Sequence, residues 1–190
     1  MTAFSAAANA APSAILEPWT SGPTPAFILD ALDGGETRLS SYRGAVLLVH
    51  FFATWCAPCR TELPALDRFA ARRAQKGPRV VAIAVGEVEP AVRRFLGAGP
   101  LAFCVLLDRD RAVAKAWDIY ALPTTVVLDA ALGPLRVAVG DVEWDDPAID
   151  RLFDQLSPTS PAARSIGGRP PHLSRSRLLQ PPAAQSGRTP

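Results

Sequence analysis

Two cysteines stand where a wholly apolar segment gives way to an amphipathic one. Residues 46–52 (Val-Leu-Leu-Val-His-Phe-Phe) are apolar on both faces except for one histidine, which is typical of a central strand buried between helices. Residues 56–73 carry apolar side chains at helical spacing: Leu63, Leu66, Phe69 and Ala70. Cys56 and Cys59 therefore lie at a predicted strand-to-helix junction.

The rest of the predicted domain alternates between strand and helix patterns. Short runs at residues 26–29 and 37–39, separated by Asp33-Gly34-Gly35, predict a β-hairpin at the edge of the domain. Further strands are predicted at residues 80–85, 102–107, 124–128 and 135–139, and helices at residues 89–96, 111–117 and 146–156. This alternation predicts an α/β domain, a central mixed β-sheet flanked by helices.

The spacing of the two cysteines suits redox chemistry. Cys56 would lie at the helix N-terminus, where free N–H groups and the helix dipole stabilise the thiolate that attacks a disulfide. Cys59, nearly one turn on, could then attack the mixed disulfide and release the substrate. Pro58 fits the first helical turn and Trp55 covers the approach to the sulfurs. The alternatives are two buried cysteines paired by chance, or half of a metal site.

Composition excludes several other classes of protein. Residues 1–156 hold all 18 acidic residues and 15 of the 20 basic ones, a net charge of −3, so no basic stripe for nucleic acid is present. Three cysteines are too few for a disulfide framework, and the second Cys or His pair of a structural zinc site is missing. No run approaches the roughly 20 apolar residues of a membrane-spanning helix. No cofactor beyond the cysteine pair is implied.

Composition also divides the chain into three parts. Residues 1–24 are rich in Ala, Pro, Ser and Thr, and we interpret them as leader and linker. Residues 25–156 form the predicted domain, and residues 157–190, with seven Pro, five Arg and six Ser, are predicted to be disordered. Ala8-Asn9-Ala10 is similar to the small-residue end of an export signal, without its basic and apolar parts. Two hypotheses stay open: a remnant of an export signal, or a disordered leader.

The motifs around the cysteines resemble those of the thioredoxin-like superfamily. Trp-Cys-Ala-Pro-Cys-Arg at residues 55–60 matches its active-site pattern, Pro64 lies where that family kinks its active-site helix, and Ala-Leu-Pro-Thr-Thr at residues 121–125 looks like its cis-proline loop. The match is closer to the TlpA/ResA/DsbE-type proteins of bacterial cell envelopes. The N-terminal hairpin, a Glu three residues after the second cysteine, and an extra helix and strand at residues 89–107 point that way.

The resemblance implies a thioredoxin fold and roles for particular residues. Pro123 would follow a cis peptide bond and shape a substrate groove, leaving the Leu122 backbone free to pair with an extended substrate. Glu62 would lie near the cysteines and tune their pKa or accept a proton from Cys59; the alternative is a Glu that merely suits the start of a helix. Substrate contacts are expected from four residues: Trp55, Ala57, Pro58 and Leu122.

The resemblance also implies a place and a direction. The family acts in the periplasm or cell envelope, with a cytoplasmic location as the alternative for this chain. We expect a monomer that reduces disulfide-containing protein substrates, such as apocytochrome c cysteines or a copper-delivery protein, and that is recharged by a membrane electron donor.

Two residues depart from the family pattern or stand alone. His50 occupies the position on the central strand where thioredoxins carry a buried Asp. A neutral imidazole there is a candidate proton relay to Cys59, a charged one would lower the thiol pKa, and a satisfied core histidine is the competing interpretation. Cys104 has no partner at useful spacing and is expected to be a small core hydrophobe, with a regulatory or second redox thiol as the alternative.

Two other functions use the same sulfurs. A thiol peroxidase would place its cysteine in a Pro-x-x-x-Thr-x-x-Cys loop, which this chain lacks before Cys56. A copper or zinc carrier would need a third ligand near Cys56 and Cys59, and the only Met is Met1.

Overall fold

The computed structural model describes residues 15–156. Residues 1–14 and 157–190 lie outside this part, and with them the proposed remnant of an export signal and the predicted disordered tail. Among residues 15–156, none of the helices combines the length and the apolar character needed to cross a bilayer.

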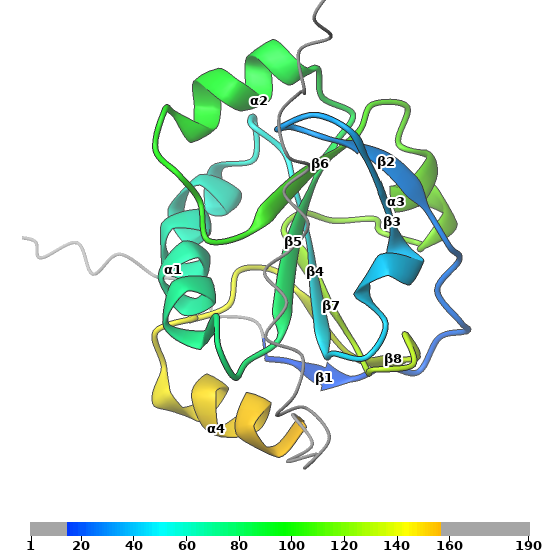
Figure 1. Cartoon of the computed structure of the whole chain (residues 1–190), viewed down its shortest axis with the longest axis vertical. Helices are drawn as coiled ribbons and strands as arrows, with labels where there is room; N and C mark the ends of the chain where they lie inside the picture. Colours follow the sequence, from blue (N-terminus) through cyan, green and yellow to red (C-terminus); the bar gives the residue numbers. More distant parts are fainter. Residues whose placement is uncertain (1–14, 157–190) are drawn as a thin grey trace, which may run out of the picture. The chain divides into compact units, whose positions relative to one another are not determined.

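The core of the domain is one mixed sheet of eight strands in the order β1-β8-β7-β4-β5-β6-β2-β3 (Figure 1). The strands are β1 (Glu17–Pro18), β2 (Ile28–Ala31), β3 (Glu36–Arg38), β4 (Leu47–Phe52), β5 (Arg79–Val85), β6 (Cys104–Asp108), β7 (Thr124–Leu128) and β8 (Pro134–Val139). The β4–β5 and β5–β6 pairs are parallel, and all the others are antiparallel. The predicted hairpin is confirmed as β2 and β3 at one edge of the sheet.

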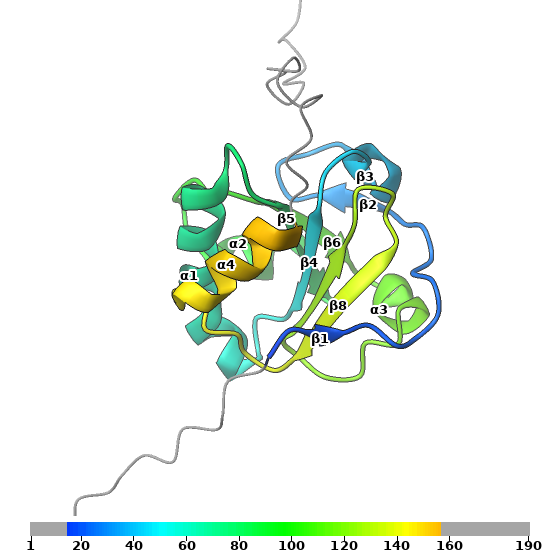
Figure 2. The same ribbon diagram turned by 90° about the horizontal axis from the view of Figure 1, so that it is seen from below.

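Helices cover both faces of the sheet. Figure 2 shows α1 (Ala57–Arg73), α2 (Glu89–Leu96) and α4 (Pro147–Leu156) on one side, and α3 (Ala112–Ala116) on the other. The 3-10 helix η1 (Leu39–Tyr42) links β3 toward β4. The predicted α/β domain with a central mixed sheet is thereby confirmed.

Strand β4 explains how two cores form around one sheet. All six of its residues are buried, and successive side chains point to opposite faces. Leu48 and Phe52 pack with the residues of α1, whereas Val49 and Phe51 pack with those of α3. His50 shares the face of Leu48 and Phe52, so it lies on the side of the sheet that α1 covers.

The domain begins earlier than residue 25, where the sequence placed its start. Glu17 and Pro18 pair with Val137 and Arg136 of β8 as an eighth strand, and the Trp19 N–H donates to the Leu135 carbonyl at 2.9 Å. A two-residue strand that contains proline has no alternation to detect, and proline is tolerated there because the strand lies at the sheet edge.

Helix α3 is shorter than the predicted residues 111–117 because its start is fixed by a buried carboxylate. Asp108 at the end of β6 accepts hydrogen bonds from the backbone N–H groups of Val113, at 3.2 Å, and Ala114, at 2.8 Å. Arg111 precedes the helix in a left-handed conformation, with φ of 62°. The cap orients the chain that runs on to the loop before β7.

Candidate active site

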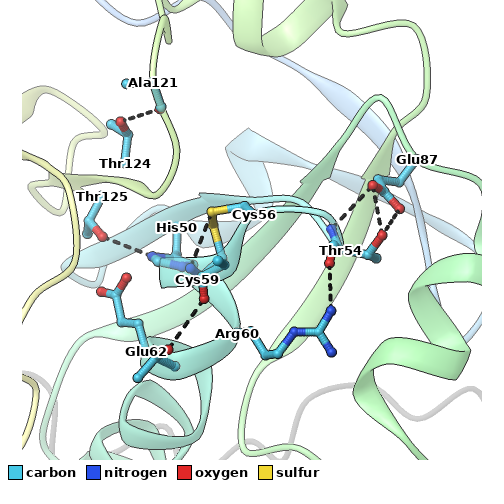
Figure 3. The surroundings of a disulfide bond; sticks show 12 residues. His50, Thr54, Cys56, Cys59, Arg60, Glu62, Glu87, Ala121, Thr124 and Thr125 are labelled. Carbon is cyan, nitrogen blue, oxygen red and sulfur yellow. Dashed lines mark hydrogen bonds between the residues drawn. A yellow bond between two sulfur atoms is a disulfide. The ribbon is translucent and has the colours of Figure 1, made fainter.

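Cys56 and Cys59 form a disulfide at the carboxyl end of β4, where α1 begins (Figure 3). Cys56 is the N-cap residue of α1, and its sulfur accepts a hydrogen bond from the Cys59 backbone N–H at 3.2 Å. Pro58 lies in the first turn, where an amide hydrogen has no partner within the helix. The helix N-terminus therefore directs an N–H group and its positive dipole end at the Cys56 sulfur, as thiolate stabilisation requires.

The two sulfurs differ in access. Cys56 is 5 % exposed and Cys59 is fully buried, so an incoming thiol or disulfide can reach Cys56 only. Trp55 beside it is 66 % exposed. Ala57 and Pro58 are also exposed.

The loop before β7 belongs to the same end of the sheet. Because β7 runs antiparallel to β4, the start of β7 lies where β4 ends. The Leu122–Pro123 peptide bond is cis, and the loop is held by a hydrogen bond from the Thr124 hydroxyl to the Ala121 carbonyl at 2.8 Å (Figure 3). Within residues 15–156 no hydrogen bond uses the Leu122 backbone N–H or carbonyl, so both are available to a bound peptide.

Glu62 is buried on α1 and held by residues that follow β8. One carboxylate oxygen, Oε1, accepts hydrogen bonds from the Val142 backbone N–H, at 3.1 Å, and from the Trp144 indole N–H, at 2.6 Å. The other, Oε2, is buried without a partner among the described residues. Burial raises the pKa of Glu62 to about 7, against these two hydrogen bonds, which lower it. A glutamate exposed to water at the start of a helix would have neither this burial nor the raised pKa that it causes.

Replacing Glu62 by glutamine is expected to remove one titration from the stability of the protein. Its pKa is about 7 in the fold against 4.5 unfolded, so the folded protein keeps a proton that the unfolded chain releases. The parent's free energy of unfolding should therefore fall by about 3 kcal/mol, relative to Glu62→Gln, as pH rises from 4.5 to 7. Urea unfolding of both oxidised proteins across this range measures the difference, and parallel curves would contradict it.

His50 is fully buried and neutral. Its Nδ1 lies 3.0 Å from the Thr125 hydroxyl on β7, and Nε2 has no hydrogen-bond partner among the described residues (Figure 3). Burial lowers the pKa of the imidazole to about 3. A charged imidazole is therefore not available to lower the thiol pKa, and His50 is only half satisfied as a core histidine. Its neutral form keeps one free nitrogen on the face that α1 covers.

The third cysteine lies apart from this site. Cys104 on β6 is half-buried and packs with the core on the α3 side of the sheet, whereas Cys56 and Cys59 belong to the core on the α1 side. Burial raises the pKa of its thiol. Among residues 15–156 no group of three or more His, Cys, Asp or Glu side chains could hold a metal ion.

Sequence reasoning missed a second set of polar residues beside the disulfide. Glu87, after β5, binds Thr54 in the turn that leads to Cys56, and Arg60 of α1 also contacts Thr54. No local pattern marks Glu87, because its partner is 33 residues away in the chain.

A redox-active cysteine pair at the head of α1, facing a cis-proline loop, defines a thiol–disulfide oxidoreductase of the thioredoxin-like superfamily. Residues 20–133 match the model of the Redoxin family, and the chain belongs to that family. It is 32% identical to the thiol-disulfide oxidoreductase ResA of Geobacillus kaustophilus (strain HTA426), over 70% of this chain and 76% of that protein.

Solved structures agree with this assignment. A thiol:disulfide interchange protein of the thioredoxin family from Chlorobium tepidum TLS superposes with a TM-score of 0.62 at 30% identity, covering 70% of this chain and 94% of that one. The exposed lipoprotein thioredoxin Etrx1 from Streptococcus pneumoniae strain TIGR4 gives 0.60 at 26% identity, covering 70% and 100%.

Proposed function

We propose that this oxidoreductase reduces disulfides of protein substrates in the cell envelope. The observation that carries the proposal is the unequal access of the two sulfurs at the head of α1, next to a Leu122 backbone with unused hydrogen-bonding groups. An extended peptide can pair with that backbone while its disulfide reaches Cys56. The similarity to an exposed lipoprotein thioredoxin supports an envelope location.

The reduced protein would act in two exchange steps. The Cys56 thiolate attacks one sulfur of the substrate disulfide, forms a mixed disulfide and expels the other substrate sulfur as a thiolate. Cys59 then loses its proton and attacks the Cys56 sulfur, which restores the Cys56–Cys59 disulfide and releases the second substrate thiolate. Two electrons pass to the substrate, and two protons complete its thiols. The sulfurs carry both electrons, so the reaction needs no other cofactor.

Glu62 is proposed as the acceptor of the Cys59 proton. It lies one helical turn beyond Cys59 on the same helix, and a carboxyl with a pKa of about 7 exchanges protons readily near neutral pH. Neutral His50, behind the pair on β4, is proposed to relay protons through its free Nε2.

The proposed partners follow from the direction of the reaction. A reductase must regain two electrons after each cycle, and we propose a membrane electron donor. Apocytochrome c cysteines or a copper-delivery protein are the proposed substrates, and the protein is proposed to work as a monomer.

A glutathione redox titration of the Cys56–Cys59 couple tests the direction. Thioredoxin-fold proteins span about −270 to −120 mV, and we expect a potential below about −200 mV, toward the reducing end. Quenched thiol alkylation at each glutathione ratio gives the potential. The titration uses the Cys104→Ser variant, so that only Cys56 and Cys59 are alkylated. A value near the oxidising limit would overturn the reductase proposal.

The Cys59→Ser variant should trap substrates as mixed disulfides. Without the second sulfur, Cys56 can attack but nothing inside the protein displaces the bound cysteine. Reduced Cys59→Ser protein, mixed with envelope proteins, should form covalent complexes. Dithiothreitol should cleave these mixed disulfides, and mass spectrometry identifies the substrates that are released. The Cys56→Ser/Cys59→Ser variant should form none. Complexes that form equally well in this control would rule out attack by Cys56.

A further inference from the structure

A buried carboxylate holds the turn that carries the reactive cysteine. Glu87 is 7 % exposed, and its Oε1 accepts hydrogen bonds from the Thr54 backbone N–H, at 3.2 Å, and the Thr54 hydroxyl, at 3.0 Å. Its Oε2 lies 2.9 Å from the same hydroxyl (Figure 3). Burying a carboxylate is costly unless donors satisfy it, and Thr54 supplies both donors that the described residues give it.

The fold brings Glu87 to this point through the parallel pairing of β4 and β5. Both strands end at the same edge of the sheet, where Thr54 follows β4 and Glu87 follows β5. Between β5 and Glu87 the chain turns at Gly86, which has φ of +69° and whose N–H donates to the Asp108 carbonyl at 2.8 Å. A side chain at Gly86 would be strained at this φ and would collide with Arg111, so the turn requires glycine.

The Thr54 residue is also held from its carbonyl side. Arg60, next to Cys59, donates from its guanidinium to the Thr54 carbonyl at 3.2 Å. The same guanidinium lies 5.1 Å from the centre of the Phe95 ring on α2. The segment from β5 to α2 thus contacts both ends of the redox motif. Glu87 contacts Thr54, before Cys56, and Phe95 contacts Arg60, after Cys59.

We propose that Glu87 is a positioning residue for disulfide exchange, acting through Thr54. The two hydrogen bonds to Thr54 fix the turn whose next residues are the exposed Trp55 and the reactive Cys56. A protein substrate must dock on Trp55 and present its sulfur to Cys56 in one geometry, whereas a small disulfide needs no docking. Glu87 therefore contributes to the reaction with protein disulfides and little to that with small ones. This inference rests on exchange at Cys56, whichever direction the reaction takes.

Four variants test the proposal. Glu87→Gln and Thr54→Val each weaken the contact, Thr54→Ser keeps both donors, and Glu87→Gln/Thr54→Val combines the two changes. Glu89→Gln is the matched control, because Glu89 lies two residues away and pairs instead with Arg93 on the surface of α2. Each protein is assayed for insulin reduction and for reaction with the small disulfide of Ellman's reagent.

Both single variants should lower kcat/KM for insulin about tenfold, while the rate with Ellman's reagent stays within about twofold of the parent. The double variant should be no slower than the slower single variant, because both singles break one shared interaction. Thr54→Ser and Glu89→Gln should match the parent.

Three results would overturn the proposal: equal losses with both disulfides, losses that multiply in the double variant, or a slow Thr54→Ser protein. Thermal unfolding of each variant identifies a general loss of fold, and if Glu87→Gln does not fold, Thr54→Val and Thr54→Ser still decide between the outcomes. Running the insulin-thiol reaction also in the oxidising direction separates the two proposals, since a parent protein that only oxidises defeats the reductase assignment and leaves the role of Glu87 measurable.

Discussion

Replacing Cys56 by serine should lower disulfide reduction by at least about three orders of magnitude. Removing the nucleophile of a catalytic group that works as a unit typically costs this much or more. Cys59 cannot take over, because it is fully buried and its approach is closed by the residues around it. Insulin turbidity with dithiothreitol as the electron source measures the loss against the uncatalysed rate.

The matched control for this experiment is Cys104→Ser. Cys104 lies on the other face of the sheet, and its substitution should leave the rate within about twofold of the parent. A Cys56→Ser protein that kept a tenth of the parent activity would contradict the assignment of the nucleophile. Peroxide consumption that survived in Cys59→Ser would instead favour a thiol peroxidase.

Stability in acid should depend strongly on His50. Its pKa is about 3 in the fold against 6.5 unfolded, so below pH 6.5 the unfolded chain binds a proton that the folded protein does not. The free energy of unfolding should therefore fall as pH falls, by about 4 kcal/mol between pH 6.5 and about 3.5, relative to a His50→Asn variant. Urea unfolding of the oxidised proteins at several pH values gives this difference.

Thr125→Val is the control for the histidine's hydrogen bond. It removes the partner of Nδ1 but leaves the imidazole buried, so it should cost about 1 kcal/mol with little dependence on pH. If His50→Asn and the parent lost stability in parallel on acidification, His50 would have to be charged in the folded protein.

His50 and Glu62 together should leave the free energy of unfolding nearly independent of pH between pH 4.5 and 6.5. Between pH 4.5 and 6.5 the folded state keeps the Glu62 proton, while the unfolded state keeps the His50 proton. Each state then holds one proton on this pair, so their contributions to the pH slope cancel.

The sequence was sufficient for the redox motif and for most of the sheet. A long apolar run, a Cys-x-x-Cys spacing and an amphipathic helix are local patterns, and β4 and α1 lie within one or two residues of their predicted bounds. The cis bond before Pro123 could come only from the family resemblance, since X-Pro bonds are usually trans. That loop lies more than 60 residues from the cysteines, and only the pairing of β4 with β7 brings it close.

The remaining features depend on contacts that no window of sequence contains. Burial raises the pKa of Glu62, against hydrogen bonds from Val142 and Trp144, about 80 residues away, which lower it. Thr54 and Glu87 meet only because two parallel strands end together. Strand β1 was missed because two residues carry no periodicity, and it exists only through the free edge of β8.

The placement of Cys104 has a consequence for how the chain must mature. In the folded protein the sheet separates its thiol from the Cys56–Cys59 pair. In a nascent chain the sheet has not yet formed, and in an oxidising compartment the three cysteines could form any of three disulfides instead of one. Correct pairing therefore requires that the sheet forms faster than the cysteines are oxidised by air or by an enzyme. Refolding of the reduced parent protein under oxidant should give a mixture of disulfide pairings. The Cys104→Ser variant should form the Cys56–Cys59 disulfide alone.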